Sequence, residues 1–113
     1  MSYLENIGKN AKKAFEDLKT VKHAKITKVL EDYSKSLLVN KKRIINENRK
    51  DVESVKRKHL VDRLILNDKR IEGIRHSIYQ IAKFKDPIGQ ILEQWQRPNK
   101  LKIQKVSTPI GVI

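Results

Sequence analysis

The sequence predicts a mainly α-helical protein, in which amphipathic helices over residues 1–85 are followed by a β-hairpin over residues 86–113. Through the first part, apolar residues recur every three or four positions, which is the period of a helix with one apolar face. After Pro87, apolar and polar residues alternate, which is the period of a strand. A length of 113 residues allows one domain. We therefore expect residues 1–113 to form a single domain.

Two amphipathic helices are expected in the N-terminal part. Ser2 and Glu5 have the spacing of a capping box, which begins a helix. Thr20 is expected to cap a second helix that ends near Asn40. The first helix has an apolar stripe made of Leu4, Ile7, Ala11, Ala14, Phe15 and Leu18, and the second has one made of Ile26, Val29, Leu30, Tyr33 and Leu37. Each stripe needs a partner surface.

The central part predicts shorter helices and then a regular one. The highly charged stretch 41–58 is expected to form two short helices that break around Asn48. An apolar patch over residues 60–66 leads to Asn67, which is a good N-cap. The helix after it has a three–four repeat of Ile71, Ile74, Ile78 and Ile81. We expect four to six helices up to about Phe84.

The C-terminal part predicts a hairpin. Leu101–Gln104 has the alternation of a strand, and Ile91 with Glu93–Gln96 forms a weaker one. Between them, Pro98 fixes one φ angle and Asn99 tolerates a left-handed conformation, as a hairpin turn requires. The sequence stops at Ile113, inside an apolar run and without a closing turn. We therefore expect the last strand to be cut off and the domain to be truncated.

The net charge of +13, from 26 basic and 13 acidic residues, raises the question of an anionic partner. Such a charge attracts nucleic acid or an anionic membrane face. The basic residues are spread over the whole length, however, and the abundance of Lys, Ile and Asn is typical of a genome with low G+C content. We therefore expect nucleic-acid binding to be weak and non-specific at most.

The sequence offers little for catalysis or ligand binding. It has no cysteine, which excludes a thiol nucleophile and a thiolate metal site from these residues. The three histidines, His23, His59 and His76, are too far apart in sequence to form a local metal site. The four glycines, Gly8, Gly73, Gly89 and Gly111, never form a phosphate-binding loop. We predict no catalytic, cofactor-binding or metal-binding residues.

Two further absences concern location. No apolar run approaches the roughly 20 residues that span a bilayer. The N-terminus also lacks the basic start and apolar segment of a signal peptide. We expect a cytoplasmic protein without membrane contact.

Several motifs carry a resemblance to a known family. They are Asp62-Arg63-Leu64, Leu66-Asn67, Arg70-Ile71, Gly73-Ile74, Asp86-Pro87-Ile88-Gly89, Trp95, Arg97-Pro98-Asn99, Leu101-Lys102-Ile103, Lys105-Val106 and Pro109 to Ile113. In order and spacing they resemble the N-terminal region of glutamate-5-semialdehyde dehydrogenase (gamma-glutamyl phosphate reductase), in the aldehyde dehydrogenase superfamily. Lys100 stands where the family usually has glycine, and Ser107 where a basic residue is expected. These departures suggest a strained turn and relaxed constraint on the hairpin.

The resemblance implies an NADPH-dependent oxidoreductase of proline biosynthesis. It also places the catalytic cysteine, the nucleotide-binding units and the oxyanion-stabilising asparagine beyond Ile113. We therefore expect this chain to bind no NADP, to be no enzyme by itself, and to act at most as a structural or interaction module. The alternatives are the N-terminal subunit of a split reductase, or a small basic nucleic-acid-binding protein.

An interaction module needs an uncovered surface. The resemblance implies that the apolar stripes and the hairpin pack against domains beyond this sequence. The candidate interface residues are Ile74, Ile78, Ile81, Leu92, Trp95, Leu101 and Ile103. The expected partner is a second copy of the chain, in a homo-oligomer, or the missing downstream domain.

Overall fold

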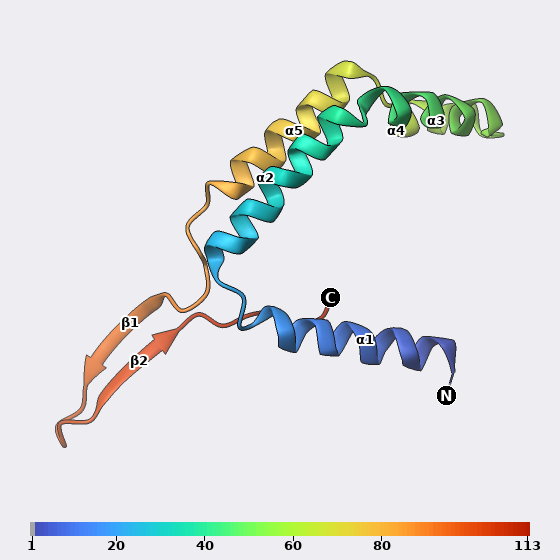
Figure 1. Ribbon diagram of the computed structural model, residues 1–113. Coiled ribbons are helices and arrows are strands. Elements are labelled where there is room, and N and C mark those ends of the chain that lie inside the picture. Colours follow the sequence, from blue (N-terminus) through green and yellow to red (C-terminus); the bar gives the residue numbers. More distant parts are fainter. Residues whose placement is uncertain (1) are drawn as a thin grey trace. The chain divides into compact units, whose positions relative to one another are not determined.

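The computed structural model describes residues 2–113, which form helices followed by a two-stranded antiparallel hairpin (Figure 1). In chain order the elements are α1 (Tyr3–Leu18), α2 (His23–Val39), α3 (Lys41–Ser54), a 3-10 turn (Lys58–Leu60), α4 (Val61–Leu64), α5 (Asp68–Ala82), β1 (Ile91–Gln96) and β2 (Lys102–Val106). The predicted fold class, mainly α with a C-terminal hairpin, is confirmed.

The chain divides into two compact units, which are described separately. One unit consists of Met1–Lys25 together with Phe84–Ile113, and the other is Ile26–Lys83. That residues 1–113 form a single domain stays a prediction.

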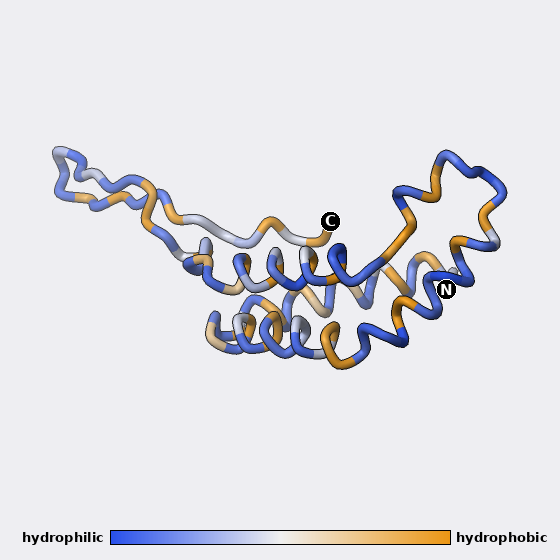
Figure 2. Tube along the Cα trace, turned by 90° about the horizontal axis from the view of Figure 1, so that it is seen from above, coloured by the Kyte–Doolittle hydropathy of each residue, from blue (hydrophilic) through white to orange (hydrophobic). Residues whose placement is uncertain are grey.

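Helix α1 begins as the sequence predicts. The hydroxyl of Ser2 accepts a hydrogen bond from the Glu5 N–H at 3.3 Å, and the Glu5 carboxylate accepts one from the Ser2 N–H at 2.6 Å. This reciprocal pair satisfies two N–H groups that a helix start leaves free. Hydrophobic positions then recur along the helix among hydrophilic ones (Figure 2). Within the described chain, α1 contains no buried residue; Ala11 and Phe15 of its apolar stripe are half-buried, whereas Leu4, Ile7 and Leu18 are exposed.

Thr20 closes α1 and does not cap α2, which corrects the prediction. Its hydroxyl donates a hydrogen bond to the Asp17 carbonyl at 2.9 Å. The last carbonyls of a helix have no partner within the helix, and a hydroxyl three residues later reaches one of them. Helix α2 begins only at His23.

In the unit Ile26–Lys83, α5 runs antiparallel to α2 and the start of α3. The Arg75 Nε donates to the Ser34 carbonyl at 3.0 Å, and Lys41 Nζ lies 2.7 Å from a carboxylate oxygen of Asp68. Moving forward along α2 and α3, from Ser34 to Lys41, the contacts move backward along α5, from Arg75 to Asp68. The segments therefore run in opposite directions. The buried residues of the described chain are Ser34, Ile71 and Ala82, with 7%, 2% and 6% of their surface exposed.

The predicted stripe of α2 is only partly covered. Leu30 and Leu37 are half-buried, whereas Val29 and Tyr33 are exposed. Ser34 is the buried residue of this helix, and its carbonyl accepts the hydrogen bond from Arg75. The most buried position of α2 is therefore a polar residue outside the predicted stripe.

Helix α3 continues through Asn48, so the predicted break there is wrong. A mid-helix Asn is unfavourable when its side chain competes for nearby backbone groups. Here the amide instead contacts residues far along the chain. Asn67 caps α5 as predicted, since its side-chain oxygen accepts a hydrogen bond from the Arg70 N–H at 2.9 Å.

The hairpin has the predicted position. Gln94 lies opposite Gln104 and Trp95 opposite Ile103, and a bulge falls between Ile91 and Glu93. The turn closes with a 2.9 Å hydrogen bond from the Lys100 N–H to the Arg97 carbonyl. Lys100, with φ of 66°, takes the left-handed conformation that the sequence assigns to Asn99. The strain expected at Lys100 is therefore present.

Candidate interaction surface

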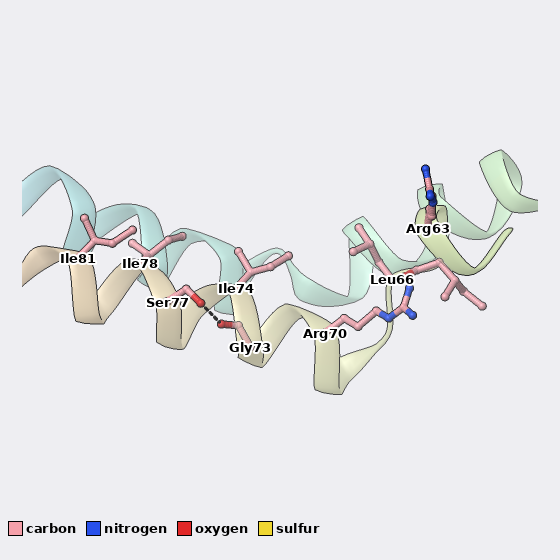
Figure 3. A pocket seen from close by; sticks show the side chains of 9 residues that line it. Arg63, Leu66, Arg70, Gly73, Ile74, Ser77, Ile78 and Ile81 are labelled. Atoms are coloured by element: carbon pink, nitrogen blue, oxygen red, sulfur yellow. Dashed lines mark hydrogen bonds between the residues drawn. The ribbon is translucent and has the colours of Figure 1, made fainter. Parts of the chain in front are cut away.

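An apolar groove of about 550 Å³ follows α5 in the unit Ile26–Lys83. Its wall along the helix consists of Ile74, Ile78 and Ile81, with Gly73 and Ser77 beside them (Figure 3). At the N-terminal end of α5 the groove is lined by Arg63, Ile65, Leu66 and Arg70. The groove is thus apolar along most of its length and has two arginines at one end.

A side chain of α3 holds the segment that forms this end. The Asn48 amide nitrogen donates to the Leu64 carbonyl at 2.9 Å, and its oxygen accepts a hydrogen bond from the Leu66 N–H at 2.7 Å. One side chain therefore makes the two hydrogen bonds that a neighbouring strand would make. The extended segment between α4 and α5 is fixed by these contacts.

Arg70 anchors the same segment from the other side. One guanidinium nitrogen donates to the carbonyls of Asp62 and Ile65, the latter at 2.8 Å. The other lies 2.8 Å from a carboxylate oxygen of Asp62. The charge of Arg70 is therefore compensated within the chain, whereas no hydrogen bond or ion pair involves the Arg63 side chain in the described part of the chain.

The predicted interface residues of α5 lie together on this groove. Ile74 and Ile81 have 42% and 50% of their surface exposed, and Ile78 is half-buried. Each lies three or four residues from the next, so the three share one face of the helix. An open apolar stripe of this kind is typical of a contact surface.

The other predicted interface residues lie on the hairpin, in the unit that contains Phe84–Ile113. Trp95 and Ile103 face each other across the two strands, and Leu101 is on the same face as Ile103 by alternation. Trp95 and Leu101 are 44% and 57% exposed. Leu92 lies in the bulge and is 58% exposed. The structure therefore divides the seven predicted residues between two surfaces.

Ser107 fixes the base of the hairpin. Its hydroxyl accepts a hydrogen bond from the Gln90 N–H at 2.9 Å and donates to the Pro87 carbonyl at 2.5 Å. Its backbone N–H and C=O also bond, to Gln90 and Gly89. Ser107 therefore bonds to three residues of the opposite segment, and the relaxed constraint expected on the hairpin stays a prediction.

Ion pairs at the start of α5 shift two pKa values. The hydrogen bond with Asp68 raises the pKa of Lys41, and the same bond lowers the pKa of Asp68. Lys41 Nζ also lies 3.8 Å from a carboxylate oxygen of Glu72. A similar exposed pair on α2 raises the pKa of Lys28 and lowers that of Asp32. These pairs join or stabilise helices and do not line the groove.

The described residues do not form a recognisable metal centre. No group of three or more His, Asp or Glu side chains is placed to hold a metal ion within residues 2–113. The His23 Nε2 lies 3.1 Å from the Phe84 carbonyl, and the His76 Nε2 lies 3.3 Å from the Gln80 amide. The structure thus gives these two histidines contacts within the chain.

A nicotinamide dinucleotide, which the resemblance implies for the family, does not fit the described residues. Its phosphates bind where a glycine-rich turn joins a strand to a helix in a parallel sheet. Here the sheet of the described chain is an antiparallel hairpin, and Gly8 and Gly73 lie inside helices. Nothing in this arrangement offers the cofactor a phosphate-binding turn.

No described helix is both long and apolar enough to cross a membrane.

The residues that sequence reasoning missed are polar side chains that bond far along the chain. Asn48, Arg70 and Arg75 each reach backbone carbonyls in another element or in the segment before their own helix. Of the three, only Asn48 could have been noticed in the sequence, because an Asn inside a helical pattern is unfavourable unless its side chain has a hydrogen-bond partner. The sequence pattern alone does not say which carbonyls are near.

Comparison of the sequence with curated proteins reveals similarity over the whole chain. It is 39% identical over 117 residues to gamma-glutamyl phosphate reductase from Desulforamulus reducens, 37% over 115 residues to that from Clostridium acetobutylicum and 37% over 117 residues to that from Aquifex aeolicus. These matches cover 98–100% of this chain. The chain spans about 28% of the length of the first two relatives and 27% of the third. No family model matches.

The fold of the chain is also similar to solved structures of the same enzyme. The crystal structure of gamma-glutamyl phosphate reductase from Thermotoga maritima superposes with a TM-score of 0.83 at 30% identity, over 93% of this chain and 26% of that one. The enzyme of the same name from Saccharomyces cerevisiae superposes with a TM-score of 0.88 at 27% identity, over 96% of this chain and 29% of that one. The resemblance predicted from the motifs is confirmed in sequence and in fold.

Proposed function

We propose that this chain, whose whole length matches the N-terminal part of gamma-glutamyl phosphate reductase, acts as a structural module that packs against the catalytic parts of such an enzyme. Two observations together carry the proposal: the chain matches only part of a reductase, and it leaves apolar side chains of α5 exposed. The chain aligns from end to end with about 28% of a relative's length. It also leaves apolar surface open on α5, where Ile74 and Ile81 are 42% and 50% exposed.

We further propose that these 113 residues alone catalyse no reduction. The resemblance implies a cysteine nucleophile, and covalent catalysis of this kind needs a thiolate, which none of these residues supplies. The resemblance also implies NADP as the cofactor of the complete enzymes. The hairpin and helices offer no phosphate-binding turn for it.

The test uses the Clostridium acetobutylicum reductase, shortened by the segment that this chain matches. The shortened enzyme and this chain are purified separately, mixed, and assayed for co-elution and for oxidation of NADPH with gamma-glutamyl phosphate. Co-elution without turnover supports the structural module. Turnover that requires both chains supports the alternative, in which this chain is one subunit of a split reductase.

Two results would contradict the proposal. The first is the absence of co-elution at micromolar concentrations of both chains, because a packing module must bind. The second is NADPH oxidation by this chain alone above a blank without protein. A nucleic-acid-binding role stays a prediction that rests on the net charge alone.

A further inference from the structure

We infer that the groove along α5 binds an amphipathic helix that carries carboxylates at the end next to Arg63. The inference rests on the proposed role as an interaction module and names the chemistry of the partner segment. Two features of the described residues lead to it, namely the shape of the groove wall and the distribution of charge along it.

The wall has the spacing of a helix-packing surface. Ile74, Ile78 and Ile81 lie in a row along α5, as Figure 3 shows, and span about 10 Å at 1.5 Å per residue. Rows of this kind are the ridges that pack into the grooves of another helix. An occupant with apolar side chains at positions i, i+4 and i+7 matches this length.

The backbone of α5 is accessible beside this row. A Cβ atom added at Gly73 meets nothing within 4 Å, so the surface there is open. Ser77 lies one turn later, and its hydroxyl donates to the Gly73 carbonyl at 3.0 Å. The polar group of Ser77 therefore has a partner inside the helix and does not need one from the occupant.

The charge distribution decides the chemistry of the occupant. Arg63 and Arg70 line one end of the groove, and no Asp or Glu lines it. Asp62 compensates Arg70 at 2.8 Å, whereas the described residues leave the Arg63 guanidinium without a hydrogen bond or ion pair. A carboxylate at this end gains an ion pair with a planar, bidentate donor.

Charge repulsion disfavours a second copy of the chain in this groove. Two copies each carry a net charge of +13. The amphipathic helix α1, whose apolar stripe is only partly covered, carries Lys12 and Lys13 as well as Lys9. An acidic helix is attracted by the field that repels a second copy.

The test uses synthetic helical peptides of 14 residues with Leu at i, i+4 and i+7. One peptide carries two Glu at its N-terminal end, and a second carries two Glu at its C-terminal end. A third carries Lys at both ends. Binding to the full chain is measured by fluorescence anisotropy, and amide chemical shifts locate the site. We expect a Glu peptide to bind at least about threefold more tightly than the Lys peptide, with shifts on α5.

Charge-swap variants test the role of Arg63. Arg63→Gln should weaken the preferred Glu peptide about threefold to fivefold, and Arg63→Glu should reverse the preference in favour of the Lys peptide. Lys69→Gln is the matched control, because it also removes one positive charge near the N-terminal end of α5, and Lys69 does not line the groove. Ile81→Ser should weaken all three peptides, while Val39→Ser, at an 83% exposed position of α2, should weaken none.

Three results would overturn the inference: equal affinity for Glu and Lys peptides, equal effects of Arg63→Gln and Lys69→Gln, or shifts confined to residues outside the groove. If this chain and the shortened reductase fail to co-elute, the proposed function is contradicted. The peptide experiments still decide independently whether the groove binds an acidic helix. Co-elution that is insensitive to Arg63→Glu, together with equal peptide affinities, contradicts only the inference.

Discussion

The side-chain amide of Asn48 pairs with the backbone of Leu66, its oxygen accepting the Leu66 N–H at 2.7 Å. The same amide donates to the Leu64 carbonyl at 2.9 Å. These residues are 16 and 18 positions away in sequence, so one side chain joins α3 to the segment that enters α5. The position of the groove's arginine end depends on this contact.

We predict that Asn48→Ala destabilises the chain by about 1–3 kcal/mol, because it leaves a partly buried N–H without a partner. Asn48→Asp should be destabilising as well, since a carboxylate accepts the Leu66 N–H but faces the Leu64 carbonyl without a proton to donate. Urea denaturation followed by far-UV circular dichroism measures the free energy of unfolding. Asn46→Ala is the control, because Asn46 is exposed on the same helix. Equal stability of the two alanine variants would contradict the role of Asn48.

The turn of the hairpin carries a second prediction. Lys100 has φ of 66°, a conformation that costs a residue with a Cβ atom about 1 kcal/mol or more. Lys100→Gly should therefore stabilise the hairpin by about 0.5–1 kcal/mol, after the larger entropy of glycine in the unfolded chain is included. Amide hydrogen exchange at Arg97, whose N–H donates to the Leu101 carbonyl at 2.9 Å beside the turn, measures the change in hairpin stability. Lys100→Ala keeps the strain and should show no comparable gain; a gain as large as that of glycine would place the cause elsewhere.

The ion pair of Lys41 and Asp68 makes a prediction about pH. The pKa of Asp68 is lowered in the folded chain, so its contribution is present above the ordinary pKa of an aspartate, about 4, and is lost as the pH falls through the lowered value. The pKa of Lys41 is raised, so its contribution is present below about 10 and is lost as the pH rises through the raised value. Between these limits the pair is fully charged.

Asp68→Asn should therefore reduce stability in this window and converge with the unchanged chain at acid pH. Urea denaturation from pH 2 to pH 8 measures the difference. Glu47→Gln, which removes an exposed carboxylate paired with Lys50 within α3, is the control for general charge effects. A stability difference for Asp68→Asn that is independent of pH would show that the ion pair is not its cause.

Local sequence patterns predicted most of the fold. The capping box of Ser2 and Glu5, the cap at Asn67 and the alternation that ends in the hairpin each depend on residues close in sequence, and each is present. Thr20 and Asn48 were misjudged because their partners decide their roles. A hydroxyl fits either the start of one helix or the end of another, and an Asn breaks a helix only when no distant group satisfies it.

The candidate surface was only partly predictable. The repeat of Ile74, Ile78 and Ile81 placed these three side chains on one face of α5, because spacing alone sets the face of a helix. It did not predict exposure, since Ile71 of the same repeat is buried. The identity of Arg63 as the uncompensated charge at the end of the groove could be seen only in the structure, since there Asp62 pairs with Arg70 and not with Arg63. No sequence pattern distinguishes these two arginines, which lie in similar surroundings along the chain.

The hairpin carries the last prediction, which is that the isolated chain self-associates in a concentration-dependent way. A two-stranded hairpin has free N–H and C=O groups along its edges, and another chain can pair with them. Trp95 is 44% exposed, so covering it removes about 100 Å² of apolar surface and contributes about 2 kcal/mol per copy. The net charge of +13 opposes association, but physiological salt screens charges beyond about 8 Å. Burial should therefore prevail as the salt concentration rises.

Sedimentation velocity over a concentration series, at low and at physiological salt, measures this balance. Trp95→Lys should shift the chain toward monomer, because a charge on the exposed strand disfavours pairing with another edge. Val39→Lys adds the same charge at an 83% exposed position of α2 and should have a smaller effect. A single monomeric species at every concentration, in both salts, would show that the hairpin surface alone does not bring copies together.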